Sequence, residues 1–191
     1  MTKEQLRQDA LQSRRALPRS SVAEMSRRVA ENVFSLGEYQ SARRIASYVA
    51  RADEVQTSLI LERALIEGKS VAVPLVDPSS DEMLFLEIRS LGDLSPGKFG
   101  ILEPKRTGQP VSLDETDMVL VPLIAWDKRG HRIGYGRGYF DRALSGRGGS
   151  IAVGLAFDSQ TVPHVPEGPS DVQLDLVVTE KNTFRFGSRP S

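Results

Sequence analysis

The spacing of hydrophobic positions near the start of the chain predicts two helices. The first is expected from the capping-box pair Thr2-x-x-Gln5 through a run of good helix formers, until Pro18 stops it. The second is expected to begin at the capping-box pair Ser21-x-x-Glu24 and to end at Gly37. Its apolar positions repeat with helical spacing, at Val22, Met25, Val29 and Val33.

Beyond these helices, short apolar runs alternate with helical segments. Strands are expected over residues 45–50, 70–76, 83–88, 117–125, 151–157 and 174–179, and helices over 57–68 and 139–144. Several runs are apolar throughout, which is typical of parallel strands buried on both faces. The pattern predicts one α/β domain over residues 1–191, with a parallel or mixed sheet covered by helices on both faces. Residues 91–110 are expected to form a loop, and residues 187–191 a mobile tail.

Composition narrows the possible function classes. The 191 residues include 25 Lys and Arg, 25 Asp and Glu, two histidines and no cysteine. The absence of cysteine excludes a disulfide framework, a thiolate nucleophile and an iron–sulfur cluster. Two histidines alone are poor material for a structural zinc site. A net charge of zero argues against a general nucleic-acid binder.

Two further features concern the location of the protein. The longest mostly apolar stretch, residues 119–126, is far shorter than the ~20 residues of a membrane span. Residues 1–15 are polar and mixed in charge, unlike a secretory signal. We therefore expect a cytoplasmic protein that does not enter a membrane.

The segment most informative about chemistry is residues 127–142, which follows the most apolar run and leads into a predicted helix. Glycines alternate at Gly134, Gly136 and Gly138, where they let backbone N–H groups approach a ligand closely. A glycine loop before a helix favours phosphate, and Arg132 and Arg137 add charge-assisted donors. Residues 128–142 hold five Lys and Arg against one Asp, so the zero net charge conceals a local basic segment.

The same segment leaves some alternatives open. Its G-x-G-x-G spacing is neither a Walker A loop nor a Rossmann fingerprint, so a phosphate site and a plain surface turn fit the spacing equally well. The aromatic residues Tyr135, Tyr139 and Phe140 could stack on a planar ligand or anchor the loop to the core. Asp141 could hold Mg²⁺ beside phosphates, because hard cations prefer carboxylate oxygen.

Residues 132–142, RIGYGRGYFDR, resemble the signature of the 5-formyltetrahydrofolate cyclo-ligase family, also called 5,10-methenyltetrahydrofolate synthetases. Other segments resemble this family in the same order, and the resemblance covers nearly the whole chain. They are Lys3-x-x-x-Arg7, residues 48–57, 99–104, 121–127 and 153–157, Gln160, Asp171 and residues 175–179. The glycine loop is the most specific part. The resemblance implies a single three-layer α/β domain with a mostly parallel, Rossmann-like sheet.

The family resemblance also implies an activity. Members convert 5-formyltetrahydrofolate and ATP to 5,10-methenyltetrahydrofolate, ADP and phosphate, with Mg²⁺. The formyl oxygen would attack the γ-phosphate, and N10 would then attack the activated carbon. Positioning and charge neutralisation suffice for such chemistry, which suits a chain with no cysteine and two histidines. The expected partners are therefore ATP and 5-formyltetrahydrofolate, and the protein is expected to be a monomer.

The site residues that the resemblance implies fall into four groups. The expected ATP contacts are Lys3, Arg7, Arg132, Ile133, Gly134, Tyr135, Gly136, Arg137, Gly138, Tyr139 and Phe140. The expected folate contacts are Val49, Glu54, Tyr135, Gly136, Arg137, Gly138 and Tyr139. Asp141 and Asp175 are the expected magnesium ligands, and Arg137 and Tyr139 the expected catalytic residues.

Two departures from the family pattern concern the folate side. Ser170 stands where the family often has histidine, and Trp126 stands where phenylalanine is common. Two other functions remain as hypotheses. A non-catalytic nucleotide- or folate-binding relative would bind ATP without turnover. Another phosphate-handling enzyme, such as a sugar-phosphate isomerase or a transferase, would need a different base or nucleophile, and none stands around the glycine loop.

Overall fold

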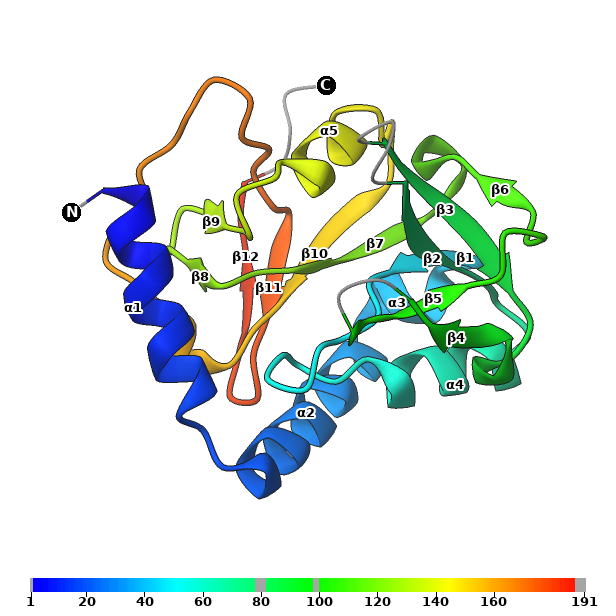
Figure 1. The fold of residues 1–191 in the computed structure, drawn as a ribbon, viewed down its shortest axis with the longest axis horizontal. Coiled ribbons are helices and arrows are strands. Elements are labelled where there is room, and N and C mark those ends of the chain that lie inside the picture. The colour runs from blue at the N-terminus through cyan, green and yellow to red at the C-terminus, as the bar shows by residue number, and fades with distance from the viewer. Residues whose placement is uncertain (1, 78–81, 98–99, 188–191) are drawn as a thin grey trace.

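The structure is a computed structural model that describes residues 2–77, 82–97 and 100–187 (Figure 1). Its main sheet has eight strands. In spatial order they are β12 (Thr183–Arg185), β11 (Leu176–Val178), β10 (Ile151–Leu155), β7 (Met118–Pro122), β1 (Arg44–Ser47), β2 (Ser70–Asp77), β3 (Glu82–Ile88) and β6 (Pro110–Val111). The strands from β11 to β2 pair in parallel, and β12, β3 and β6 pair antiparallel at the edges.

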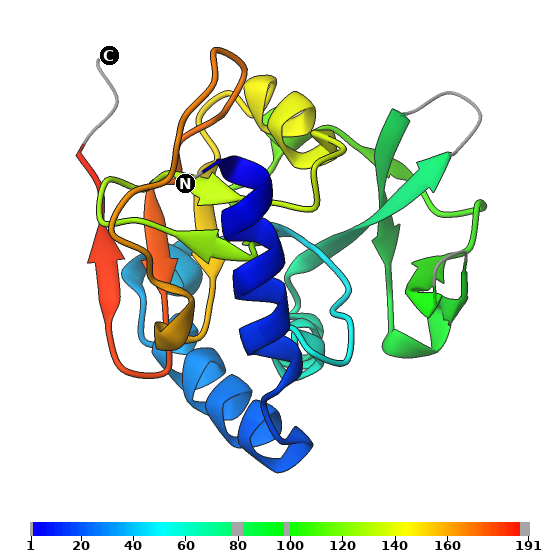
Figure 2. The same ribbon diagram turned by 60° about the vertical axis from the view of Figure 1, so that its left-hand side comes forward.

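Helices cover both faces of this sheet, which confirms the predicted three-layer α/β fold. The helices α2 (Arg19–Phe34), α3 (Gly37–Ser41) and α4 (Ser58–Ile66) lie on one face, and α5 (Tyr139–Ser145) lies on the other (Figure 1). The helix α1 (Lys3–Arg15) lies beside the hairpin of β8 (Ala125–Trp126) and β9 (Arg132–Ile133) (Figures 1 and 2). None of the helices in the described ranges is long and apolar enough to cross a bilayer.

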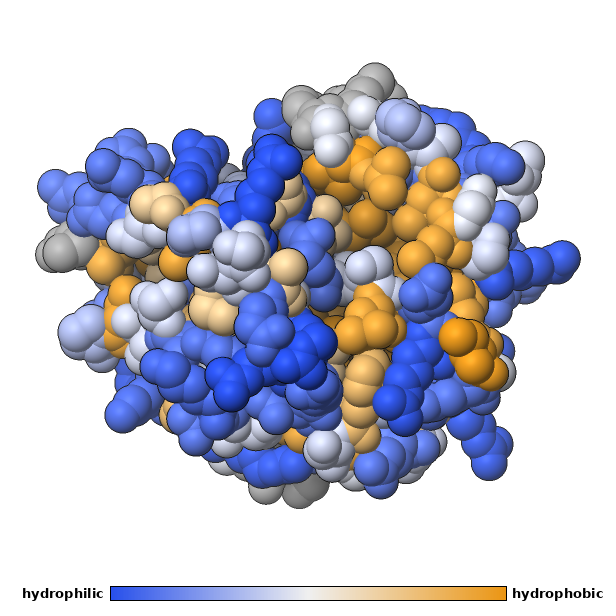
Figure 3. Space-filling view, turned by 90° about the horizontal axis from the view of Figure 1, so that it is seen from below, coloured by the Kyte–Doolittle hydropathy of each residue, from blue (hydrophilic) through white to orange (hydrophobic). Residues whose placement is uncertain are grey.

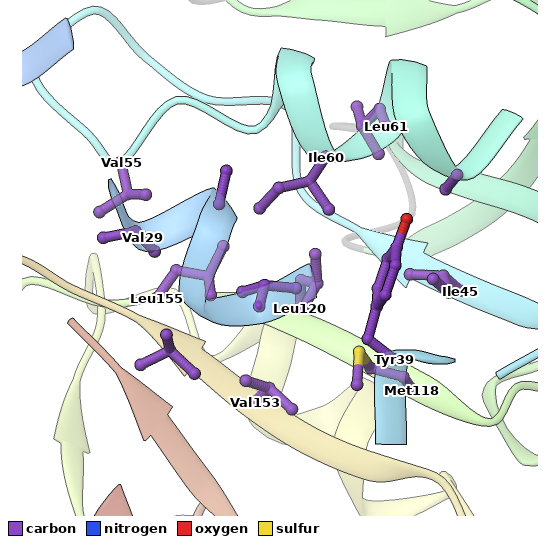
Figure 4. Close-up of a cluster of buried hydrophobic side chains, with 14 of the residues drawn as sticks. Val29, Tyr39, Ile45, Val55, Ile60, Leu61, Met118, Leu120, Val153 and Leu155 are labelled. Carbon is purple, nitrogen blue, oxygen red and sulfur yellow. The ribbon is translucent and has the colours of Figure 1, made fainter. Parts of the chain in front are cut away.

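The largest apolar core lies between the sheet and the face that carries α2, α3 and α4. Figure 4 shows Val29 from α2 and Ile60 from α4 meeting Leu120 of β7, and all three are fully buried. A second core on the other face joins Leu144 of α5 to Val119 of β7. Truncating one such buried aliphatic residue to alanine typically costs about 2–5 kcal/mol. Both cores therefore hold the strand ends, from which the site loops depart, in fixed places.

Several element boundaries differ from the sequence prediction. The capping box of Thr2 and Gln5 is confirmed at the start of α1. The capping box predicted for Ser21 and Glu24 is wrong. The helix α2 begins at Arg19 with Pro18 as its N-cap, and Glu24 pairs with Arg27 instead.

Other differences follow from short or edge elements. Gly37 does not end the second helix, which stops at Phe34, but begins α3. The strand β12 was not expected, since its three residues lack a sustained apolar run. The segment predicted as a loop over 91–110 instead contains β4 (Leu94–Pro96) and β5 (Leu102–Pro104), a separate two-stranded sheet. The predicted mobile tail lies outside the described residues from 188 onward.

Apolar surface is not spread evenly over the molecule. Seen from below Figure 1, apolar side chains gather in a hollow on one side of the molecule (Figure 3). Within the described ranges, the large apolar residues that are exposed are Leu59, Ile66, Leu84, Leu102 and Tyr135. Of these, Tyr135 belongs to the glycine loop and leads to the candidate site.

Candidate active site

Loops from two neighbouring strands and one face of α1 build the candidate site. The loop of residues 48–57 leaves the carboxyl end of β1, and the chain from β7 leads through the β8–β9 hairpin to the glycine loop of residues 134–138. Because β1 and β7 pair in parallel, both departures lie at the same edge of the sheet. Ligands of open α/β sheets bind at this edge.

The helix α1 presents three cations to these loops. Lys3, Arg7 and Arg14 are spaced by four and seven residues, which puts them on one face of a helix. Arg7 donates from Nε to the carbonyl oxygen of Gly134 at 2.9 Å, and Lys3 pairs with Asp171. Arg14 donates from Nη2 to the Tyr135 hydroxyl at 2.6 Å. The predicted ATP contacts Lys3 and Arg7 are thus beside the glycine loop and the segment that follows β10.

Two of the three loop glycines occupy backbone conformations that favour glycine. Gly136 has φ +91° and Gly138, the N-cap of α5, has φ +68°. A Cβ at Gly136 would stand 3.4 Å from the Arg7 guanidinium, whereas one at Gly134 would meet open space. The loop backbone is therefore shaped by positive φ angles, and its closest cationic neighbour is Arg7.

The aromatic residues of the loop have separate roles. The Phe140 ring packs edge-on against Phe85 of β3 with centroids 6.2 Å apart, so it anchors α5 to the core. Tyr135 is partly exposed and directs its hydroxyl to Glu54. The Tyr139 ring carries the Arg142 guanidinium 5.1 Å from its centroid. Of the two alternatives left by the sequence, core anchoring therefore holds for Phe140.

The predicted folate residues Glu54 and Tyr135 are in direct contact although 81 positions separate them. Glu54 is 5% exposed, and its Oε1 accepts the Tyr135 hydroxyl at 2.5 Å while Oε2 accepts the backbone N–H of Arg51 at 2.7 Å. Burial and the nearby Glu54 carboxylate raise the pKa of Tyr135, although Arg14 opposes the shift. Tyr135 therefore stays a hydroxyl donor at neutral pH.

The shape of the loop that carries Glu54 comes from Tyr48. Its hydroxyl donates to the Val55 carbonyl at 2.8 Å, and its own carbonyl accepts the Thr57 hydroxyl at 3.0 Å. These bonds fold the loop back on itself just before α4. Val49, a further predicted folate contact, is half-buried on this loop and packs against the larger core.

Sequence reasoning missed Arg14, whose side chain is 2% exposed and contacts Asp53 and Tyr135. Nε and Nη2 bond Asp53 Oδ2 at 3.1 and 2.9 Å, and Nη1 bonds the Leu123 carbonyl at 3.2 Å. Burial would lower the pKa of Arg14, but Tyr135, Glu54 and Asp53 together raise it. The helical spacing from Lys3 and Arg7 was the signal that could have found it.

The other end of the glycine loop holds a buried ion pair. Arg132 donates from Nη2 to Asp141 Oδ1 at 2.7 Å and from Nη1 to the Val172 carbonyl at 2.5 Å. Burial lowers the pKa of Arg132, and the Asp141 charge opposes this shift. Ile133 beside it is buried against α1, with Leu6 as a neighbour. The buried Arg132 and Ile133 side chains therefore anchor the start of the glycine loop to Asp141, Val172 and α1.

The two predicted metal ligands have different surroundings. Asp141 uses Oδ1 for Arg132 and for the Val172 N–H, while Oδ2 makes no hydrogen bond to any residue within the described ranges. Asp175 Oδ2 accepts from Arg147 at 2.9 Å and from the Ala152 N–H at 2.7 Å, at the amino ends of β10 and β11.

A magnesium ion would fit at Asp141 only together with another oxygen donor. The ranges that the structure describes contain no cluster of three or more His, Asp or Glu side chains suited to a metal. Mg²⁺ is commonly bound through one or two carboxylates, water and substrate phosphates. Asp141 Oδ2 is such a carboxylate oxygen in the first turn of α5, next to the glycine loop. The role of Asp175 stays a prediction.

The remaining predicted residues lie on the loop surface. Arg137 is exposed, and its carbonyl accepts Arg142 Nη1 at 2.9 Å. His131 pairs with Glu167 at 2.7 Å. The structure thus places Arg7 against Gly134 of the glycine loop, while Tyr135 of the same loop faces Glu54.

These features define an α/β protein with a cation-flanked glycine loop at the ligand-binding edge of its sheet. The family model described as "5-formyltetrahydrofolate cyclo-ligase family" matches residues 1–180. The chain belongs to this family, as the sequence predicted. Its relatives include the 5-formyltetrahydrofolate cyclo-ligase of Haemophilus influenzae, 34% identical over 78% of this chain and 83% of the relative. The Escherichia coli K12 enzyme of the same name is 30% identical over 92% and 98%.

Solved structures agree with this assignment. The chain resembles 5,10-methenyltetrahydrofolate synthetase of Aquifex aeolicus with a TM-score of 0.87 and 32% identity, over all of this chain and 96% of the other. The synthetase of Mycoplasma pneumoniae has the same fold, with a TM-score of 0.76 and 24% identity over 94% and 99% of the two chains. The protein is therefore an enzyme of the cyclo-ligase family.

Proposed function

We propose that the protein uses ATP and Mg²⁺ to cyclise 5-formyltetrahydrofolate to 5,10-methenyltetrahydrofolate, with release of ADP and phosphate. The observation that carries this proposal is the two-sided environment of one short loop. Gly134 accepts a bond from the cationic Arg7, and its neighbour Tyr135 donates to the buried Glu54. The same loop therefore borders a cationic region at Arg7, which suits phosphate, and a carboxylate at Glu54, which suits a ligand that donates hydrogen bonds.

The proposed chemistry has two steps. The formyl oxygen attacks the γ-phosphorus of ATP, the bond from that phosphorus to the β,γ-bridging oxygen breaks, and ADP leaves. N10 then attacks the activated carbon, the carbon–oxygen bond to phosphate breaks, and phosphate leaves with the N10 proton. The product is the methenyl cation. Neither step needs a strong protein base, because orientation and charge neutralisation lower the barriers.

Cations and backbone donors support the phosphate side of the proposal. Arg7 reaches the loop from α1 and Lys3 reaches Asp171 in the segment after β10, and the loop glycines permit close approach of a ligand to the backbone. Arg137 and Tyr139 are the proposed catalytic contacts within the loop. Lys3 and Arg7 are paired with Asp171 and Glu4, so ATP binding would exchange these carboxylates for phosphate oxygens.

A carboxylate in need of donors supports the folate side. Glu54 is almost fully buried, and it makes no ion pair with a lysine or arginine in the described ranges. A buried charge of this kind is stabilised by N–H donors that point at it. The amino group and adjacent ring N–H of a pterin form such a pair of donors. We therefore assign the pterin to Glu54, with Val49 and Tyr135 beside it.

The proposed magnesium ligand beside the glycine loop is Asp141. Asp175, the second ligand that the family resemblance implies, lies at the amino ends of β10 and β11 and stays a prediction. A bound Mg²⁺ neutralises charge on the triphosphate. Arg132 and the Val172 N–H hold Asp141 Oδ1, which leaves the orientation of Oδ2 fixed. The role of the chain here is to orient this oxygen.

Growth of methenyltetrahydrofolate absorbance after mixing the protein with 5-formyltetrahydrofolate and Mg-ATP tests the proposal. Asp141→Asn is expected to lower kcat by about 100-fold, because it removes charge from the phosphate site. Asp158→Asn, which only loses a surface pair with Lys181, is the matched control and is expected to leave kcat unchanged. Folded wild-type protein that binds ATP without turnover would instead favour a non-catalytic relative.

Removal of Mg²⁺ by a chelator is expected to abolish turnover and to leave 5-formyltetrahydrofolate binding intact. Glu54→Gln is expected to act in the opposite way, raising the KM for 5-formyltetrahydrofolate about tenfold with a smaller effect on kcat. Equal losses of kcat and folate affinity in Asp141→Asn would remove this residue from the metal role.

A further inference from the structure

Arg14 connects three segments of the folate side, although its own side chain is almost fully buried. It lies in the last turn of α1 and bonds Asp53 of the 48–57 loop, the Leu123 carbonyl after β7, and Tyr135 of the glycine loop. Its side chain is 2% exposed. Burying an arginine is costly unless each donor finds a partner, and here the partners come from three separate segments.

The charges around Arg14 are unevenly matched. Asp53 forms a direct ion pair with it at 2.9 Å, which balances the buried guanidinium. Glu54, next in the chain, is 5% exposed and bonds the Tyr135 hydroxyl and a backbone N–H. One negative charge of the cluster therefore rests on Glu54, separated from Arg14 by a single neutral hydroxyl.

Arg14 fixes the direction of that hydroxyl proton. An arginine has no acceptor, so Tyr135 Oη must accept from Nη2 along their 2.6 Å bond. The one proton on Oη is then directed to Glu54 Oε1. Without Arg14, the hydroxyl could turn its proton toward water or toward a bound ligand, and Glu54 would lose the donor that holds Oε1.

We propose that Arg14 is a positioning residue for folate recognition: through the Tyr135 hydroxyl, it fixes the orientation in which Glu54 receives the donors of the pterin. This inference rests on the proposed function. Arg14 is not a catalytic residue, because it contacts neither substrate nor the reacting atoms. Its effect is expected on the KM for 5-formyltetrahydrofolate, and not on the KM for ATP, which depends on Lys3, Arg7 and the loop backbone.

The test is a double-mutant cycle with Arg14→Met and Tyr135→Phe, in which both KM values and kcat are measured. Each single variant is expected to raise the KM for 5-formyltetrahydrofolate about tenfold, since Tyr135→Phe removes the hydroxyl that donates to Glu54 and Arg14→Met lets that hydroxyl turn away. The KM for ATP is expected to change less than about twofold. The KM of the double variant for 5-formyltetrahydrofolate is expected to equal that of either single variant. Both changes break the same series of hydrogen bonds, from Arg14 through Tyr135 to Glu54.

Arg15→Met is the matched control, since Arg15 is exposed on the same turn of α1. It is expected to leave both KM values unchanged. If Arg14→Met fails to fold, Arg14→Lys replaces it, and its effect on the folate KM is compared in the wild-type and the Tyr135→Phe backgrounds. A point-charge donor in place of the planar guanidinium is expected to raise the KM only where the hydroxyl is present.

Three results would overturn the inference: a parallel rise of both KM values, a fall in kcat alone, or effects of Arg14 and Tyr135 variants that multiply in the double variant. Each would mean that Arg14 supports the fold or the ATP side instead. Absence of turnover in the folded wild-type protein would overturn the proposed function itself. Active wild-type protein with an unchanged folate KM in the Arg14 variants would overturn only the inference.

Discussion

Replacing Gly136 by alanine tests whether the glycine loop is shaped by the backbone angle seen in the structure. Gly136 has φ +91°, outside the regions that alanine adopts freely, and a Cβ there would contact the Arg7 guanidinium at 3.4 Å. A non-glycine residue held at such an angle costs about 1–3 kcal/mol. Gly134→Ala is the matched control, because Gly134 has no positive φ and nothing lies within 4 Å of its added Cβ.

Urea unfolding and thermal melting measure this difference. Gly136→Ala is expected to lose about 1–3 kcal/mol and Gly134→Ala about 0.5 kcal/mol or less. For a chain of this size, about 2–4 °C of Tm accompany each kcal/mol. Gly136→Ala is also expected to weaken ATP binding, because relief of the strained backbone angle would displace the loop beside Arg7. Equal losses of stability in the two variants, or an unchanged ATP affinity in Gly136→Ala, would refute the reasoning.

Three more predictions concern the support of the site. Gly154→Ala is expected to cost about 1–3 kcal/mol by urea unfolding, because its Cβ would meet Leu174 at 2.6 Å and Leu123 at 2.8 Å in the core. Burial would raise the pKa of Asp127, but bonds from the Val165, Arg129 and His131 N–H groups lower it. Asp127 therefore stabilises the fold above about pH 4, and this contribution is lost on acidification through the lower folded pKa, so urea titrations should show the Asp127→Asn deficit at pH 7 shrinking below pH 4. Fluorescence of Trp126, fully buried and the single tryptophan, should report unfolding and change little on ATP binding.

Local signals in the sequence were enough for much of the fold. The Thr2 and Gln5 capping box needs only residues three apart, and it was found correctly. The apolar run that became β7 was recognised because it is buried on both faces. The second capping box failed because Pro18 already starts α2, and the sequence pattern does not tell an N-cap from a residue one turn inside.

The site was partly predictable from the glycine loop and the family resemblance, and the rest depends on contacts between distant residues. Tyr135 and Phe140 stand in one aromatic-rich loop, yet one faces Glu54 and the other faces Phe85 in the core. No local property separates them, since tertiary packing decides the direction of each ring. Arg14 shared a helix face with Lys3 and Arg7, but its partner Tyr135 lies 121 residues away.

The long-range contacts of α1 have a consequence for the folding of the protein during its synthesis. Lys3 reaches Asp171, 168 positions later, and Arg7 reaches Gly134, 127 positions later. Closing such long loops comes late and is slow compared with forming local structure. During synthesis the first helix leaves the ribosome long before its partners exist. A truncated or nascent chain can thus build the β1–β2 pair while α1 still lacks its partners, and the contact of Lys3 with Asp171 can form only after residue 171 of 191 has been made.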